Sequence, residues 1–245
     1  MRLARANLKA QHFDTFFGQV WTLLNPLLLA GVYFLIIAVV LDAQSNTIEY
    51  LGILLSGLFV FYYTRHAVIL GSGAVLGGSK LIMNTAFPRL LLPLSAMVSA
   101  VFRFAPMLVV YALFHVAAGF PVGFELVFIP VILAILTVFN FGLILAAAAA
   151  TVFVRDLKNL LPFVLRIWLY TSPVLYTVDQ VPEEIEAFFA FNPMYPIIGS
   201  WHSVLIDGDV PSARLMAYAT LWAVVVLSGG AWYFLRRERD FAVRI

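Results

Sequence analysis

Three long apolar runs without a charged side chain constrain this chain more than any other feature. They are Val20–Leu41, Leu126–Val154 and Leu215–Leu235, with 22, 29 and 21 residues. A helix needs about 20 apolar residues to cross the hydrocarbon core of a bilayer. The whole chain is 63% hydrophobic and 11% charged, whereas a soluble domain has about 45–50% apolar and about 25% charged residues. We therefore predict an all-α integral membrane protein.

Three further runs are long enough to span but contain one arginine each. Leu51–Leu70 contains Arg65, Leu90–Ala118 contains Arg103, and Asn159–Val178 contains Arg166. Counting these runs as spans gives six transmembrane helices in a single transmembrane domain that covers residues 1–245. The predicted spans are residues 20–41, 51–70, 90–118, 126–154, 159–178 and 215–235.

The distribution of basic residues predicts the orientation, because cytoplasmic loops carry an excess of lysine and arginine. With the N-terminus inside and six alternating spans, the only basic residue on the outside is Arg214. The inside then holds Arg2, Arg5, Lys9, Lys80, Arg89, Arg155, Lys158, Arg236, Arg237, Arg239 and Arg244. We expect a multi-pass protein with both termini in the cytoplasm.

The first 19 residues are amphipathic. Leu8, Phe13, Phe16 and Phe17 share one side of a helical wheel with Val20. This pattern favours an interfacial helix that lies along the membrane surface. A simple extension of the first span is the alternative.

A cytoplasmic segment between the second and third spans, about residues 71–89, is glycine-rich and then amphipathic. Apolar residues such as Leu81 and Ile82 alternate there with Lys80, Asn84 and Arg89. We expect a short cytoplasmic helix that acts as a docking element.

The outer segment 178–214 is too short for two more spans. Pro182 and the acidic residues after it resemble a helix start, and a second short helix is expected at residues 196–206, with Asn192–Pro193 between them. Two short apolar helices favour a re-entrant hairpin, which is tolerated where protein buries the backbone. A hairpin that lies flat on the membrane surface is the alternative.

Signatures of catalysis or cofactor binding are lacking in the sequence. The chain has no cysteine, four scattered histidines and a net charge of +2, so we expect neither a metal site nor nucleic-acid binding. The glycines of the stretch from Gly71 to Lys80 lack the Gly-Lys-Ser/Thr ending of a phosphate loop. Packing by small residues between helices explains them better. We expect no catalytic residue and no bound cofactor.

Residues inside the apolar runs are candidates for a substrate path. Arg103 lies deepest, and at the bilayer centre an arginine costs about 2.5–3.5 kcal/mol unless a partner or an aqueous cavity receives it. Arg166 and Arg65 lie closer to the inner interface, so they could also extend to it. Phe59, Tyr62 and Tyr63 cluster in the second span, where they could stack on sugars or form an interfacial belt.

Four motifs occur in order along nearly the whole chain. They are Phe17-Gly-Gln-Val-Trp21 with Asn25-Pro26; Asn84-Thr-Ala-Phe-Pro-Arg89 with Leu92-Pro93; Val154-Arg-Asp-Leu157 with Pro162 and Ser172-Pro-Val174; and Asn192-Pro193. The ordered set resembles the membrane subunits of type-2 ABC exporters for polysaccharides. Phe17 stands where the family usually has leucine.

This resemblance implies a homodimer in the bacterial cytoplasmic membrane, paired with two ABC ATPase subunits that bind ATP and Mg²⁺. The substrate would be a lipid-linked glycan such as an O-antigen, teichoic acid, capsule or galactan. The resemblance also suggests three groups of functional residues. They are ATPase-coupling residues Lys80, Asn84, Phe87, Pro88 and Arg89; substrate-path residues Arg103, Arg166, Phe59, Tyr62 and Tyr63; and outer-gate residues Phe188, Phe189, Asn192 and Pro193.

Two other functions share parts of this pattern. A type-2 ABC permease for a drug or a lipid would have the same fold. A membrane-embedded enzyme or a stand-alone channel would work without an ATPase partner.

Overall fold

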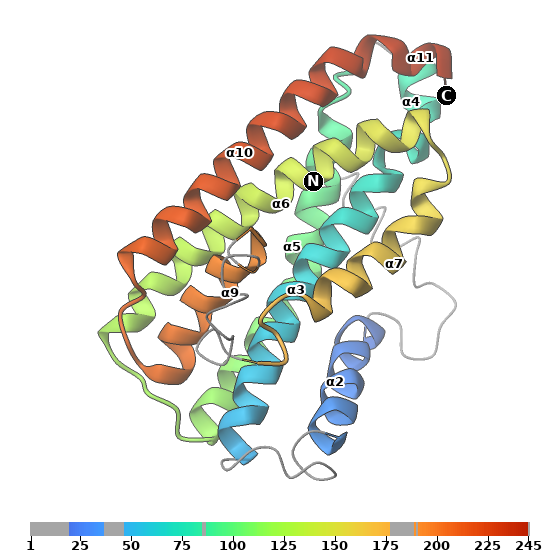
Figure 1. The fold of residues 1–245 in the computed structure, drawn as a ribbon. Coiled ribbons are helices and arrows are strands. Elements are labelled where there is room, and N and C mark those ends of the chain that lie inside the picture. Colours follow the sequence, from blue (N-terminus) through green and yellow to red (C-terminus); the bar gives the residue numbers. More distant parts are fainter. Residues whose placement is uncertain (1–19, 37–46, 85–86, 177–188, 190, 245) are drawn as a thin grey trace.

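The structure is a computed structural model that describes residues 20–36, 47–84, 87–176, 189 and 191–244. Within these residues the regular structure is entirely helical and contains no strand, as the sequence predicts (Figure 1). The elements are α2 (Val20–Phe34), α3 (Thr47–Gly77), α4 (Ser79–Asn84), α5 (Leu91–Ala117), η2 (Phe124–Val127), α6 (Phe128–Phe153), α7 (Leu157–Tyr170), α9 (Met194–His202), η4 (Ser203–Asp207), α10 (Ala213–Arg237), η5 (Glu238–Asp240) and α11 (Phe241–Arg244).

Helix α3 forms the centre of the molecule. It contacts α2, α5, α6, α7 and α9, and most of its residues from Tyr50 to Val75 are buried. Apolar residues occur all round this helix, which is the pattern expected when neighbours surround it on every side. The main core therefore lies around α3, and a smaller core lies at the end of the molecule that holds α4 and α11.

Helices α6 and α10 run side by side over most of their lengths (Figure 1). Their backbones touch where Gly142 faces Gly230. A Cβ atom on Gly142 would lie 2.5 Å from the backbone of Val226 and Leu227. Small residues permit this close approach, a common device in membrane helix pairs.

Four helical stretches among the described residues are long and apolar enough to cross a membrane. They are Thr47–Asn84, Leu91–Ala117, Phe124–Phe153 and Ala213–Arg244. They overlap the predicted second, third, fourth and sixth spans, although α3 continues to Gly77, beyond the end predicted for the second span at Leu70. A shorter apolar helix, Leu23–Phe34, lies within the predicted first span, while the six-span topology as a whole stays a prediction.

Helix α7 is shorter than the predicted fifth span, 159–178. It has 14 residues and ends at Tyr170, so it is about 21 Å long. Residues 171–176 form turns and bends. Pro173 explains this ending, because a proline disfavours the helical conformation of the residue before it.

The predicted short elements appear where the structure describes them. The cytoplasmic helix corresponds to α4, and the second outer helix corresponds to α9 with the π-helical turn η4. Every residue of α9 is buried, and the helix packs on α3, α6 and α10. This half of the hairpin therefore lies within the helix bundle, whereas the predicted interfacial helix 1–19 and the first half of the hairpin lie outside the described residues.

Candidate functional site

A cavity of about 300 Å³ lies between α2, α3 and α7. Its lining combines two arginines and three tyrosines with aliphatic residues and one phenylalanine, and none of the described lining residues is acidic. The lining residues are Leu29 and Tyr33 of α2; Phe61, Tyr62 and Arg65 of α3; and Leu165, Arg166, Leu169 and Tyr170 of α7. We call this the α2–α3–α7 cavity.

The tyrosines of this cavity are held by one another and by an arginine. The hydroxyl groups of Tyr33 and Tyr170 are hydrogen-bonded at 2.9 Å, and their rings meet edge to face. The guanidinium carbon of Arg65 lies 5.2 Å from the centre of the Tyr62 ring, within the range of a cation–π interaction. The cavity therefore presents cationic groups and aromatic rings together.

Arg166 lies on α7, about 13 Å along the helix from Leu157. Its side chain is exposed, while Leu165 next to it is buried against the core. The 3.6-residue period of the helix separates these two positions, so one side of α7 packs inward and another remains accessible. Arg166 can therefore meet a ligand without breaking the packing of α7.

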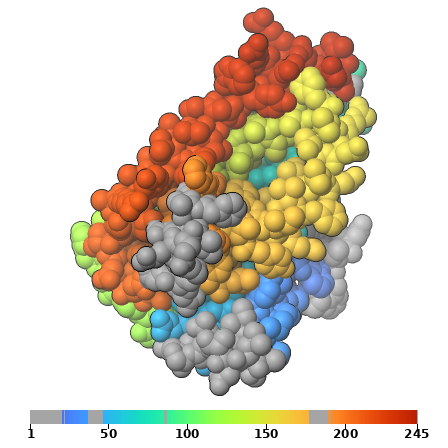
Figure 2. Space-filling model, viewed as in Figure 1, coloured from blue at the N-terminus to red at the C-terminus, as the bar shows by residue number. Residues whose placement is uncertain are grey.

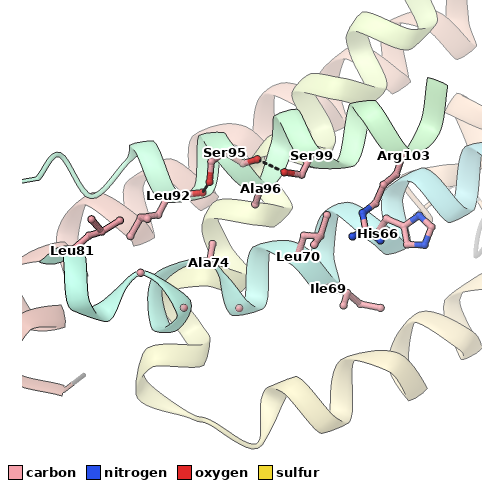
Figure 3. Close-up of a pocket in the computed structure, with 13 residues that line it drawn as sticks. His66, Ile69, Leu70, Ala74, Leu81, Leu92, Ser95, Ala96, Ser99 and Arg103 are labelled. Carbon is pink, nitrogen blue, oxygen red and sulfur yellow. Dashed lines mark hydrogen bonds between the residues drawn. The ribbon is translucent and has the colours of Figure 1, made fainter. Parts of the chain in front are cut away.

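Arg103 lies in a different cavity, of about 340 Å³, between α3 and α5. Figure 3 shows Arg103 beside His66 at one end, and Leu81 and Leu92 at the other. Small residues form much of the wall between these ends, and the Ser99 hydroxyl donates to the Ser95 carbonyl of its own helix at 2.8 Å. We call this the α3–α5 cavity.

The two cavities lie on neighbouring faces of α3. Tyr62 lines the first and His66 lines the second, and their rings are in edge-to-face contact with centres 5.9 Å apart. The structure therefore brings Arg166, Arg65 and Tyr62 together but puts Arg103 in a separate place.

Phe59 and Tyr63, predicted on the substrate path, line neither cavity in this structure. Both side chains are buried in the main core. Tyr63 stacks on Phe104 with ring centres 4.5 Å apart, and its hydroxyl group is 3.2 Å from the Thr137 hydroxyl.

Tyr33 is a cavity residue that the sequence analysis missed. It is the only tyrosine in the first predicted span, which also contains Trp21 and Phe34, and its hydroxyl group within an apolar run was the available signal. Its role depends on Tyr170, which is 137 residues away in the sequence, so the pairing could not be foreseen.

Asn192 connects the end of α7 to the start of α9. Its side-chain oxygen accepts hydrogen bonds from Trp168 Nε1 at 2.8 Å and from the Met194 amide at 3.0 Å. Its nitrogen donates to the Thr171 carbonyl at 2.7 Å and to the Ser172 hydroxyl at 3.1 Å.

The other predicted outer-gate residues lie around Asn192. Phe189, Asn192 and Pro193 help to line a cavity of about 290 Å³ beside Trp168, while Phe188 lies outside the described residues. The structure thus places these three together at the junction of α7 and α9.

The predicted coupling residues lie in α4 or in the loop that follows it. Lys80, Asn84 and Pro88 are exposed, and Phe87 is half-buried against the smaller core. Arg89 is half-buried, and its guanidinium donates a hydrogen bond to the backbone carbonyl of Glu238. Three of the five residues are therefore accessible to a partner.

The described residues form a helical bundle with long apolar helices, which is one of the two structures that can span a membrane, and arginines that line its internal cavities suit a transport protein. Residues 1–205 match the family model of the ABC-2 type transporters, so the chain belongs to this family. Its members are transport subunits, as the sequence motifs predict.

Two relatives carry a more specific name. The O-antigen export system permease protein RfbA of Myxococcus xanthus is 29% identical over 246 residues, which cover 99% of this chain and 94% of the relative. The protein of the same name from Klebsiella pneumoniae is 26% identical over 209 residues, which cover 85% and 80% of the two chains.

Proposed function

We propose that this chain is the membrane-spanning subunit of an ATP-driven exporter that moves a lipid-linked polysaccharide outward across the bacterial cytoplasmic membrane. The observation that carries this proposal is the similarity to an O-antigen export permease over 99% of the chain. The family match and the chemistry of the cavities support it.

The α2–α3–α7 cavity suits the two parts of such a substrate. Guanidinium groups bind phosphate in a forked, charge-assisted geometry, so Arg65 and Arg166 would recognise a lipid-linked phosphate or pyrophosphate. Tyr33, Tyr62 and Tyr170 would contact the sugars through their rings and hydroxyl groups. In this proposal Arg103 is a second cationic position, and Phe59 and Tyr63 support the path from the core.

The partner that completes the path would be a second copy of this chain. Leu160, Phe163, Val164 and Ile167 form an exposed apolar stripe on α7, each 46–65% exposed. Figure 2 shows α7, in yellow, as part of the molecular surface. A homodimer that pairs these stripes would bring the two Arg166 side chains toward a shared path.

Energy would come from a pair of ABC ATPase subunits that bind ATP and Mg²⁺. Exposed Lys80, Asn84 and Pro88 would meet the ATPase, while Phe87 and Arg89 anchor the element from within. This arrangement puts α4 and both chain termini in the cytoplasm.

The remaining topology follows from this orientation. Residues 1–19 would lie at the inner interface, and six spans would cross the membrane. The hairpin 178–214 would re-enter the outer leaflet and form the outer gate with Phe188, Phe189, Asn192 and Pro193. The burial of α9 among α3, α6 and α10 supports a re-entrant rather than a flat hairpin.

The first test is affinity purification of the tagged chain from native membranes in mild detergent, with identification of co-purifying proteins. We expect an ABC ATPase in equal amount and a dimeric permease. A folded, dimeric preparation without an ATPase would contradict the proposal and favour a channel or a membrane enzyme.

The second test separates a glycan exporter from a permease for drugs or lipids. The purified complex is given short lipid-linked oligosaccharides, free lipids or amphiphilic drugs, and ATP hydrolysis is measured with each. We expect the lipid-linked oligosaccharide to stimulate hydrolysis most strongly. Stimulation by drugs or free lipids alone would support the alternative permease.

A further inference from the structure

The last seven described residues, 238–244, fold back from α10 onto the end of the molecule that holds α4 (Figure 1). They comprise the short helices η5 and α11 and lie beyond residue 205, where the family match ends. We call this segment the C-terminal clamp.

Phe241 anchors the clamp in the smaller core. Its side chain is fully buried, and its ring centre lies 5.3 Å from that of Phe234 and 6.4 Å from that of Phe153. The same core contains Ile82 of α4 and Leu92 of α5. One aromatic side chain thus joins a cluster that draws residues from α4, α5, α6 and α10.

Two arginines from two different loops bind the backbone of the clamp. Arg89, in the loop between α4 and α5, donates to the Glu238 carbonyl. Arg155, in the turn between α6 and α7, donates to the Arg244 carbonyl at 3.3 Å. Hydrogen bonds from a charged donor are stronger than those between neutral groups.

Two arginines near the C-terminus, Arg237 at the end of α10 and Arg244 in the clamp, in turn contact the end of α6. The guanidinium carbons of Arg237 and Arg244 lie 5.1 Å and 4.8 Å from the centre of the Phe153 ring. Phe153 is the last residue of α6. Contacts of three kinds therefore join the clamp to both loops and to the end of α6.

We propose that the C-terminal clamp makes the two inner loops a single mechanical unit, so that movement imposed on α4 is passed to α6 and α10. We expect a loop without this support to yield locally, because packed side chains and rigid elements can carry coupling between distant sites. Phe241, Arg89 and Arg155 are positioning residues in this scheme. The inference rests on the proposed ATP-driven function.

This inference changes the role of Arg89. The motif resemblance suggests that Arg89 couples the permease to the ATPase. The simplest interpretation of this role is a direct contact between Arg89 and the ATPase. In the structure its guanidinium points toward the C-terminal backbone. Arg89 then acts through the clamp, and only the exposed residues of this element meet the ATPase.

The test compares Phe241→Ala with Val243→Ala in the full-length permease–ATPase complex, reconstituted in liposomes with a lipid-linked oligosaccharide. Val243 is on the same short helix but is 88% exposed, so it is a matched control. We measure export, ATP hydrolysis and the amount of ATPase that co-purifies with each variant.

We expect Phe241→Ala to retain the ATPase and hydrolyse ATP within about twofold of wild type while export falls about tenfold. Phe241→Leu should restore most of the export, and Val243→Ala should match wild type. Normal export by Phe241→Ala at the normal ATP cost would overturn the inference. A loss of export in proportion to lost ATPase would also overturn it, because the segment would then serve docking alone.

Arg155→Ala keeps the test decisive if Phe241→Ala does not fold, since it removes one hydrogen bond at an exposed side chain. It should raise the ATP consumed per substrate exported, and an unchanged ratio would count against the clamp. If the wild-type complex shows no ATP-driven export, the proposed function fails first, and the role of the clamp fails with it.

A double-mutant comparison separates the two roles of Arg89. If Arg89 acts through the clamp, Arg89→Ala should cost little further export in the Phe241→Ala background, because residues of one network are not additive. Fully additive losses would indicate an independent contact with the ATPase and would contradict the inference.

Discussion

At the scale of single residues, the arginines of the α2–α3–α7 cavity are accompanied by tyrosines rather than by carboxylates. Arg65 rests on the ring of Tyr62, and no acidic residue is among the described residues that line the cavity. A cation–π contact contributes about 0.5–2 kcal/mol without neutralising the charge. The cavity can therefore hold its cations in place and still attract an anion.

Arg166→Ala should lower export of a pyrophosphate-linked substrate about tenfold or more, because one charge-assisted contact is worth about 1.5–3 kcal/mol. Arg166→Lys should retain part of the activity, since it keeps the charge but loses the fork. Transport into inverted vesicles measures the effect. Arg214→Ala is the control, because Arg214 is exposed and lies over Tyr218 of α10; an equal loss in both variants would refute a specific role.

Asn192 shows how one side chain can define the ends of two helices. Its amide makes four hydrogen bonds, two as acceptor and two as donor. A half-buried amide with this many partners is difficult to replace, because each lost bond exposes a group that water reaches poorly.

Asn192→Ala should lower the free energy of unfolding by about 1–3 kcal/mol, since the groups it served lose their partner. Thermal unfolding of the purified protein in detergent measures the change. Thr171→Ala is the control, because the Thr171 hydroxyl bonds only to carbonyls of its own helix and its backbone carbonyl remains for Asn192. Equal midpoints for the two variants would contradict the proposed junction.

At the scale of elements, the pair α6 and α10 depends on backbone contact. Gly142 and Gly230 meet without an intervening side chain, whereas Gly229, the neighbour of Gly230, faces open space. Of these two adjacent glycines, Gly230 has no room for a side chain, whereas Gly229 does.

Gly230→Ala should destabilise the protein by about 1–3 kcal/mol, because the added methyl group would force the two helices apart. Gly229→Ala should be neutral or stabilising, since alanine is the better helix former by about 1 kcal/mol. Thermal unfolding of both variants in the same detergent gives the comparison. A Gly230→Ala variant as stable as Gly229→Ala would show that the backbones need not touch.

Element by element, the sequence predicted what depends on local patterns. Phe128–Phe153 and Ala213–Arg237 follow from uninterrupted apolar runs. The end of α7 at Tyr170 was missed because the apolar pattern continues past it, although Pro173 was a local signal for the break; the Asn192 hydrogen bonds at this junction could not be predicted. The residue types of Arg166 and Tyr62 were the basis for predicting them on the substrate path. The burial of Tyr63 against Phe104 could not be predicted in the same way, because it depends on tertiary packing.

At the scale of the whole molecule, the described helices have two distinct ends. One end holds α4, α11 and the α6–α7 turn, and the other holds η2, η4 and the start of α10 (Figure 1). The proposed orientation puts the first end in the cytoplasm. Since the chain has no cysteine, single cysteines can report on either end without a background signal.

A membrane-impermeant maleimide should label Asp209→Cys in intact cells and Lys158→Cys only after the membrane is opened. Both positions are exposed in the protein, so the difference measures sidedness rather than burial. The reverse pattern would invert the topology. Labelling of both in intact cells would show that they share the outer side.

The backbone contact between Gly142 and Gly230 also distinguishes a closely packed group of helices, α3, α6 and α10, from the less extensively packed helices α2 and α7. No side chain separates α6 from α10 at this point, so we expect these two helices to move together, and α3 packs along α6. Helices α2 and α7 pack less extensively on this group, and they form two of the three walls of the α2–α3–α7 cavity. If that cavity widens to admit a chain of sugars, we expect α2 and α7 to move relative to this group of helices.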